Sequence, residues 1–105
     1  MGQKKRPTKS ATTRPVLVTD THRGIYFGYL RETLEGGNAV RLERARHCYM
    51  YRCAPGHEGV YGLATHGPAE GSKIGPHTSM IVRDVSKIVE CSAEAVRRWD
   101  AAIWA

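Results

Sequence analysis

The feature that most limits the fold is a change of face inside a β-patterned segment, residues 23–30. Ile25 and Phe27 share one face of the predicted strand, but the next apolar residue, Leu30, has the opposite parity. Side chains of a flat strand alternate strictly between its two faces, so this switch requires a bulge or a sharp bend. The switch falls at Gly28, and a glycine inside a strand pattern is typical of such a bend.

A second segment, residues 39–51, changes face in the same way. Val40 and Leu42 share one face, and Ala45, His47, Tyr49 and Tyr51 then alternate on the opposite parity. The pattern predicts another bend near Glu43 and Arg44. Two long strands that each change face are what a small barrel or a rolled sheet requires.

Shorter patterns complete the predicted fold. They indicate a strand that follows Pro15, a hairpin turn rich in Gly and Asn, a short internal helix, and two further strands around a tight turn. These elements cover residues 16–19, 34–38, 57–66, 79–84 and 85–91. We therefore predict an α+β fold: a small, strongly bent antiparallel sheet or barrel of about five strands, with one internal helix and a C-terminal helix.

The C-terminal helix has a clear start signal. Ser92 is a good N-cap, and Glu94 lies in the first turn, near the positive end of the helix dipole. Val96, Trp99 and Ile103 follow at helical spacing and predict one apolar stripe.

The positive charge of the chain is concentrated at its N-terminus. Residues 1–14 carry five of the sixteen Lys and Arg residues, namely Lys4, Lys5, Arg6, Lys9 and Arg14, and no acidic residue precedes Asp20. Residues 15–105 are therefore close to neutral. Because residues 1–14 are almost free of apolar side chains, we predict a disordered basic arm before a single domain of residues 15–105. The arm is either a tether for a polyanion or a solubilising tail.

The most informative stretch for function is basic and aromatic, and it lies in the third predicted strand. Arginines beside tyrosine rings can hold a phosphate and stack a base. The predicted ligand-binding residues are Arg44, Arg46, Tyr49, Tyr51 and Arg52. In the alternative interpretation Tyr49 and Tyr51 pack in the barrel or at a subunit contact. Arg44 and Arg46 then pair with Glu residues on neighbouring strands.

Catalysis, cofactors and metals find little support in the sequence. No phosphate-binding glycine loop, paired-carboxylate signature or nucleophile elbow is present, so we expect no enzyme activity, no catalytic residue and no cofactor. His47, Cys48, Cys53 and His57 lie close in sequence, and Cys48-x4-Cys53-x3-His57 offers three ligands. A zinc site usually needs a second well-spaced pair, and the Pro and two Gly of the loop do not favour a fixed geometry. We expect reduced thiols and no metal, although the sequence does not decide whether these four residues bind one.

Three residues near the C-terminus are candidates for an interface. Trp99, Ile103 and Trp104 could anchor a partner, since Trp is enriched at interface hot spots. The alternative for Trp99 is that it docks the helix on the sheet. Of the three, Trp104 is the better candidate for an intersubunit contact.

Several short motifs together resemble a family of small phage and prophage proteins of unknown function. The similar segments are Val16–Thr19, Arg23–Leu30, Val40–Arg46, Tyr49–Tyr51, Leu63–Gly67, Lys73–Pro76 and Ile88–Ala95. This chain has Arg46-His47 where the family has two basic residues, and Tyr where Trp is common. The resemblance brings no catalytic residues. It implies a phage-type accessory protein that acts inside a bacterial cell, in the class of regulators and counter-defence factors.

Together these observations favour a non-enzymatic protein that binds a phosphate-bearing ligand, either a nucleic acid or a small nucleotide signal. The rival hypothesis is a protein-binding or structural phage component that assembles through its aromatic residues. We further expect a homo-oligomer, since a small sheet must protect its edges. A host or phage protein is a further partner to consider. No apolar run is long enough to span a bilayer and no signal peptide is recognisable, so we expect a location in the bacterial cytoplasm.

Overall fold

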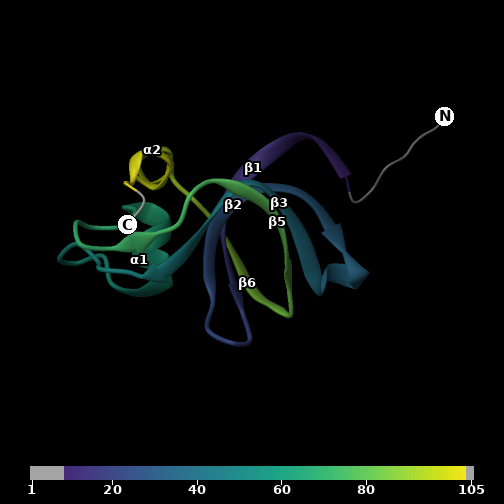
Figure 1. Ribbon diagram of the computed structural model, residues 1–105, viewed down its shortest axis with the longest axis horizontal. Coiled ribbons are helices and arrows are strands. Elements are labelled where there is room, and N and C mark those ends of the chain that lie inside the picture. Colours follow the sequence, from purple (N-terminus) through teal and green to yellow (C-terminus); the bar gives the residue numbers. More distant parts are fainter. Residues whose placement is uncertain (1–8, 104–105) are drawn as a thin grey trace.

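The computed structural model describes the backbone of residues 9–103 and the side chains of residues 13–103. The chain forms β1 (Lys9–Asp20), β2 (Ile25–Leu34), a 3-10 turn η2 (Glu35–Gly37), β3 (Ala39–Met50), α1 (Gly59–Thr65), β4 (Lys73–Ile74), β5 (Thr78–Arg83), β6 (Val85–Glu90) and α2 (Ala93–Ala101). The architecture is α+β, as predicted, and the two helices lie together on one side of the sheet (Figure 1).

The described strands form one antiparallel sheet in the order β4-β3-β2-β1-β6, and β5 also pairs with β3. The first half of β3, from Ala39 to Ala45, pairs with β5, whereas Cys48 and Met50 in the second half pair with β4. The predicted number of about five strands missed β4, because its two residues lie in a Gly- and Pro-rich connection.

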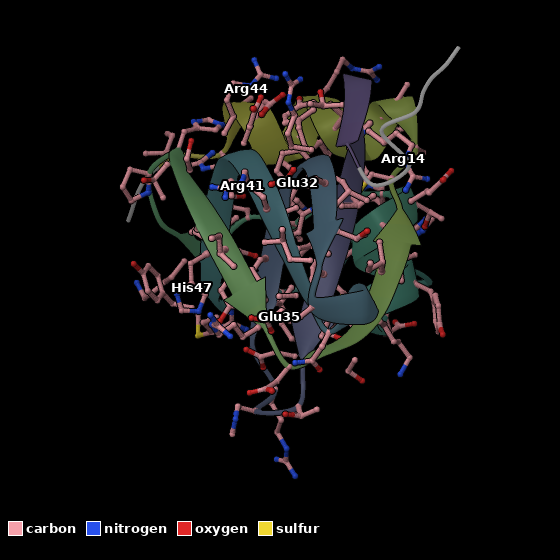
Figure 2. All side chains as sticks on the ribbon, turned by 90° about the vertical axis from the view of Figure 1, so that its right-hand side faces the viewer. Arg14, Glu32, Glu35, Arg41, Arg44 and His47 are labelled. Atoms are coloured by element: carbon pink, nitrogen blue, oxygen red, sulfur yellow. The ribbon has the colours of Figure 1, made fainter. Side chains whose placement is uncertain are left out.

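The sheet is strongly curled but open, so the alternative of a closed barrel was wrong. β5 pairs with β3, whereas β6 lies at the other end of the strand order beside β1, yet Asp84 alone connects β5 and β6. The curl brings the two strands together at this residue, where the Val85 amide donates to the carbonyl of Asn38, directly before β3, over 3.0 Å. Figure 2 shows β5 and β6 diverging from this point, and no ladder joins them within residues 9–103.

The second predicted bend, at the change of face in β3, is confirmed. Phe27 pairs with Arg46 and Tyr29 pairs with Glu43, so β3 has one more residue than β2 between these two pairs. Arg44, in the bulge, has a φ of 48°. A bulge of this kind bends the strand and moves the following side chains to the other face.

Gly28 occupies the matching position on β2. A Cβ atom there would lie 3.0 Å from the Cβ atoms of both Leu42 and Ala45, so the absence of a side chain lets the two strands pack closely. Phe27, before the bend, faces the helices, and Leu30, after it, faces the inside of the curl. The change of face in the sequence therefore reflects a real change of core.

These bends produce two hydrophobic clusters, one on each face of β1. The first lies between the sheet and the helices and contains Leu17, Ile25, Phe27, Cys48, Leu63, Ala64, Ile74, Ala95 and Trp99. The second fills the inside of the curl and contains Val16, Val18, Leu30, Val40, Leu42, Ala45 and Val82. β1 contributes to both clusters with three consecutive, fully buried residues.

The start of α2 is as predicted, but its end is not. The Ser92 hydroxyl accepts a hydrogen bond from the Ala95 amide over 3.1 Å, which caps the helix. The helix ends at Ala101, so Ile103 lies beyond it and is 83% exposed. The predicted apolar stripe therefore does not extend to Ile103.

The first strand begins earlier than predicted, at Lys9 rather than Val16. In its upstream part the backbone of Arg14 pairs with Leu30, and the Arg14 guanidinium lies 2.6 Å from the Glu90 carboxylate. Residues 1–8, which include Lys4, Lys5 and Arg6, lie outside the described residues, so their role as a basic arm stays a prediction. No helix in the described part of the chain is long and apolar enough to cross a membrane.

Candidate ligand-binding site

Arg46, one of the predicted ligand-binding residues, is buried inside the protein. Its side chain is only 2% exposed. Nε donates to the carbonyl of Gly75 over 2.8 Å, and NH1 donates to the carbonyl of Trp99 over 2.7 Å. Burial lowers the pKa of this guanidinium, and the nearby carboxylate of Asp100 acts in the opposite direction. Arg46 is therefore hydrogen-bonded within the fold. A residue that contacts phosphate would face solvent, and Arg46 does not.

Arg44 is exposed but lies on a different contact network. Its guanidinium carbon is 4.1 Å from the centre of the Tyr29 ring, and NH2 is 4.0 Å from the Asp100 carboxylate. Figure 2 shows Arg44 beside α2. Asp100 also accepts hydrogen bonds from the Tyr29 hydroxyl and from Nε2 of His77. Burial is the main cause that raises the pKa of Tyr29 to about 12, and the hydrogen bond to Asp100 is the second.

The two predicted tyrosines at the end of β3 are on the surface. Tyr49 is 59% exposed and Tyr51 is 42% exposed, with Met50 at 38% between them. The Tyr49 ring lies 4.6 Å from the His47 ring, which in turn stacks on Tyr26 at 4.8 Å. The alternative that these tyrosines pack inside the sheet is therefore not realised in the described chain, and both rings are available to a ligand or a partner.

Arg52 lies against the loop that precedes β4. Its amide donates to the Ser72 hydroxyl over 2.8 Å, and its carbonyl accepts from the Ala69 amide over 2.8 Å. A Cβ atom on Gly71 would lie 3.0–3.1 Å from Cδ and Nε of Arg52, so this glycine lets the side chain lie flat on the loop. Arg52 is the one predicted cation that the fold places beside a cavity.

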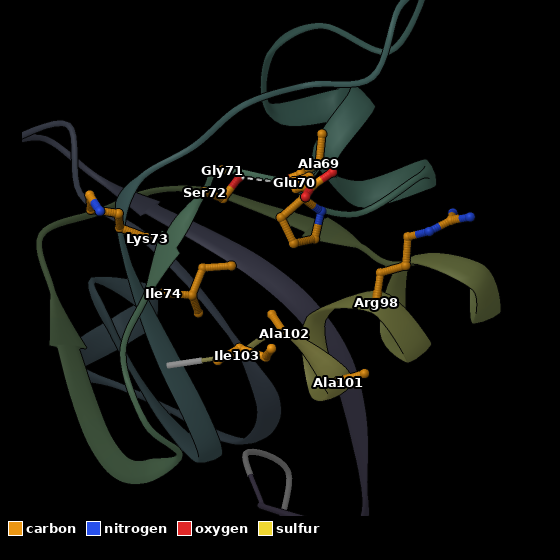
Figure 3. A pocket seen from close by; sticks show the side chains of 11 residues that line it. Ala69, Glu70, Gly71, Ser72, Lys73, Ile74, Arg98, Ala101, Ala102 and Ile103 are labelled. Atoms are coloured by element: carbon orange, nitrogen blue, oxygen red, sulfur yellow. Dashed lines mark hydrogen bonds between the residues drawn. The ribbon is translucent and has the colours of Figure 1, made fainter. Parts of the chain in front are cut away.

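That cavity, of about 560 Å³, separates the loop from the last turn of α2 (Figure 3). Its lining residues are Pro68, Ala69, Glu70, Gly71, Ser72, Lys73, Ile74, Arg98, Ala101, Ala102 and Ile103. Ile74 is 1% exposed and forms an apolar floor. The alanines on both walls leave the space open because their side chains are short.

The charges around this cavity are mostly positive. Lys73 and Arg98 line it, Arg52 lies behind the loop, and Glu70 is the only acidic lining residue among those described. Arg98 is held by Glu94 and by the carbonyl of His66. Arg52 and Lys73 form no ion pair with any residue between 13 and 103.

Other strand arginines are neutralised by cross-strand partners. Arg41 lies 2.9 Å from Glu32, as Figure 2 shows, and Arg83 lies 2.7 Å from Glu35. The alternative interpretation, in which Arg44 and Arg46 pair with Glu residues on neighbouring strands, was wrong, because Arg44 lies beside Asp100 of α2 and Arg46 donates to two backbone carbonyls.

Sequence reasoning missed Lys73 and Arg98 as parts of this site. Residues 68–77 read as an irregular connection, and Arg98 read as one solvent-facing residue of a helix. The Gly- and Pro-rich composition of the connection was the one available signal, because such loops often carry binding residues on a rigid scaffold.

None of the three cysteines is among the residues that line this cavity. Cys48, Cys53 and Cys91 are free thiols, and burial raises the pKa of Cys48 to about 11 and that of Cys91 to about 12. The His57 ring stacks on His66 at 4.8 Å. Within the described part of the chain, no group of three or more His, Cys, Asp or Glu side chains is arranged to hold a metal ion.

The three predicted interface residues have different positions. Trp99 is fully buried; its ring stacks on Phe27 at 5.5 Å, and Nε1 donates to the Leu63 carbonyl over 3.0 Å. It therefore docks α2 on the sheet, which was the alternative role. Ile103 is exposed at the edge of the cavity, and Trp104 lies outside the described residues.

The fold and the site together define a small α+β domain with an open, curled antiparallel sheet and a cavity at the end of its last helix. The chain belongs to the family described as Domain of unknown function (DUF6948), whose profile matches residues 13–99. This family membership agrees with the expected resemblance to a family of unknown function. No curated protein and no solved structure matches the chain.

Proposed function

We propose that this chain is a non-enzymatic binding protein for a phosphate-bearing ligand, which contacts Arg52 and Lys73 and enters the cavity beside them. The observation that carries the proposal is that Lys73 lines a cavity of about 560 Å³ and Arg52 packs against Gly71 of the same lining, while neither cation forms an ion pair with any residue between 13 and 103. Small-molecule pockets typically measure about 300–1,000 Å³.

The chemistry of the lining supports a ligand with a charged part and a flat apolar part. A guanidinium and an ammonium bind phosphate by charge-assisted hydrogen bonds. Ile74 and the alanines of α2 offer an apolar surface to a ring, and the exposed Tyr51 ring, next to Arg52 in sequence, offers a stacking surface. A nucleotide or a nucleic acid carries both parts.

Two measurements distinguish a polymer from a small nucleotide. Fluorescence anisotropy with a labelled single-stranded oligonucleotide should show an affinity that falls steeply with salt if a polymer binds. Thermal unfolding in the presence of AMP or ATP should show a rising melting temperature if a small nucleotide binds. Failure of both classes to bind would refute the proposal.

A matched pair of charge reversals tests the location. Lys73→Glu should weaken whichever ligand binds by at least about tenfold, the equivalent of about 1.4 kcal/mol. Lys87→Glu is the control, because Lys87 is also exposed but belongs to β6, at the other end of the strand order. Equal losses in the two variants would indicate a diffuse charge effect and no site at the cavity.

A second candidate function rests on a separate observation. Tyr49, Met50 and Tyr51 form a consecutive run of exposed apolar side chains at the end of β3. Such a run supports assembly through aromatic residues, with a second copy or with a host or phage protein. If Tyr49→Ser with Tyr51→Ser dissociates an oligomer seen by light scattering, and no nucleotide binds the parent protein, assembly is the better assignment.

The cellular role that we propose is that of a phage-type accessory protein in the bacterial cytoplasm, with counter-defence as its purpose. The resemblance to phage and prophage proteins supports this role. Plaque counts on bacteria that carry a nucleotide-signalling defence should rise when the chain is expressed, and should rise less with Lys73→Glu. Unchanged counts would argue against counter-defence.

A further inference from the structure

The last turn of α2 forms one wall of the cavity, and its end lacks the usual cap. A helix leaves its last four carbonyls without intrahelical partners, and many helices satisfy them with a glycine in the left-handed conformation. Here the C-cap residue, Ala102, has an extended conformation, with φ −60° and ψ 137°. The carbonyl of Trp99 is one of the four, and it accepts its hydrogen bond from Arg46.

Arg46 also holds the opposite wall. Its Nε donates to the carbonyl of Gly75, which directly follows Ile74, the floor of the cavity. The Gly75 amide in turn donates to the carbonyl of His47 over 2.9 Å, which ties this segment to β3. One rigid, buried guanidinium therefore joins the end of α2 to the end of β4.

The charge of Arg46 suits this place. A cation near the C-terminus of a helix interacts favourably with the negative end of the helix dipole, and the effect is larger where the pair is shielded from water. Asp100, in the same turn, provides a nearby negative charge. These two features explain how a cation that is 2% exposed is retained without a carboxylate in direct contact.

We propose that Arg46 is a positioning residue, which fixes the distance between α2 and β4 and so keeps the cavity at the width that a ligand needs. For its effect on binding, this inference rests on the function proposed above. Its effect on the two walls can be measured without any ligand. Arg46 contacts no ligand itself.

The test compares Arg46→Met with Val82→Ala. The methionine keeps much of the apolar stem of the arginine but has no donor. Val82 belongs to the second cluster, inside the curl, so its truncation destabilises the protein away from the cavity. Thermal unfolding of both variants selects a temperature at which both remain folded.

Hydrogen exchange is the first readout. In Arg46→Met, the amides in the last turn of α2 and the Gly75 amide should exchange at least about tenfold faster, while the Cys91 amide, which donates to Pro15 over 3.1 Å, should change little. In Val82→Ala the two walls should keep their protection. If both variants show the same exchange pattern, Arg46 serves only global stability and the inference is wrong.

Binding of AMP is the second readout. Arg46→Met should bind it at least about tenfold more weakly than Val82→Ala, the equivalent of about 1.4 kcal/mol. Arg46→Lys, which keeps the charge, should recover part of the affinity. If exchange changes as expected but the parent protein binds no AMP and no oligonucleotide, the proposed function fails and the role of Arg46 in positioning the walls stands.

Discussion

Replacing Gly62 by alanine should destabilise this protein, although helix propensity predicts the opposite. Gly62 lies inside α1, where a change from glycine to alanine ordinarily stabilises by about 1 kcal/mol. In this structure, however, a Cβ atom on Gly62 would lie 1.8 Å from the carbonyl oxygen of His57 and 2.0 Å from its carbonyl carbon. These are main-chain atoms, which cannot rotate away as a flexible side chain could.

The helix must therefore move, and it carries Leu63 and Ala64 of the first cluster with it. Overpacking costs about 1–3 kcal/mol, and a contact with backbone this short belongs at or above the upper end of that range. Subtracting the propensity gain leaves a net loss of about 2 kcal/mol, a large part of the stability of a small domain.

Urea unfolding followed by circular dichroism measures this difference. Tyr61→Ala, at the neighbouring and 63% exposed position of the same helix, is the control and should change stability by less than about 0.5 kcal/mol. If Gly62→Ala is as stable as the parent protein or more stable, the contact between α1 and the segment before it is wrong.

Three further predictions concern the first cluster, the cap of α2 and the buried acids. Trp99→Ala should cost about 3–5 kcal/mol in urea unfolding, because it empties the space between α2 and Phe27; a loss below about 1 kcal/mol would contradict the packing. Ser92→Ala should cost about 1–2 kcal/mol, since the hydroxyl caps the helix and also donates to the Thr65 carbonyl over 2.6 Å; an unchanged melting temperature would exclude both bonds. Folding raises the pKa of the Cys48 and Cys91 thiols from 9.0 and that of the Tyr29 phenol from 10.0. The contribution of these three groups to the free energy of unfolding is therefore fully present below pH 9, and it is lost as the pH rises toward 11–12. Melting temperature measured against pH should therefore be flat up to pH 9 and fall above it, and a thiol reagent at pH 8 should label these two cysteines far more slowly in the folded protein than in urea; equal labelling rates would argue against their burial.

The sequence by itself determined the features that depend on neighbouring residues. The change of face around Gly28 and the second change near Arg44 predicted both bends, because the side-chain alternation of a strand is a local rule. Ser92 predicted the start of α2 for the same reason, since a cap satisfies amides only three residues away. The turn at residues 35–37 followed from two adjacent glycines, and Gly36 and Gly37 indeed have positive φ angles of 66° and 100°.

Only the tertiary structure decided which side chains of β3 face solvent and which face the core. The side-chain chemistry of Arg46 is that of a phosphate-binding residue. Its actual partners are the carbonyls of Gly75 and Trp99, which are 29 and 53 residues away along the chain. No local pattern encodes such partners. The cavity arose in the same way, from a loop and a helix end that are distant in sequence, so the composition of the loop was the only sequence signal for Lys73. Whether the sheet closes depends on the distance between β5 and β6 after all the bends have accumulated, which is a property of the whole sheet and not of any one strand.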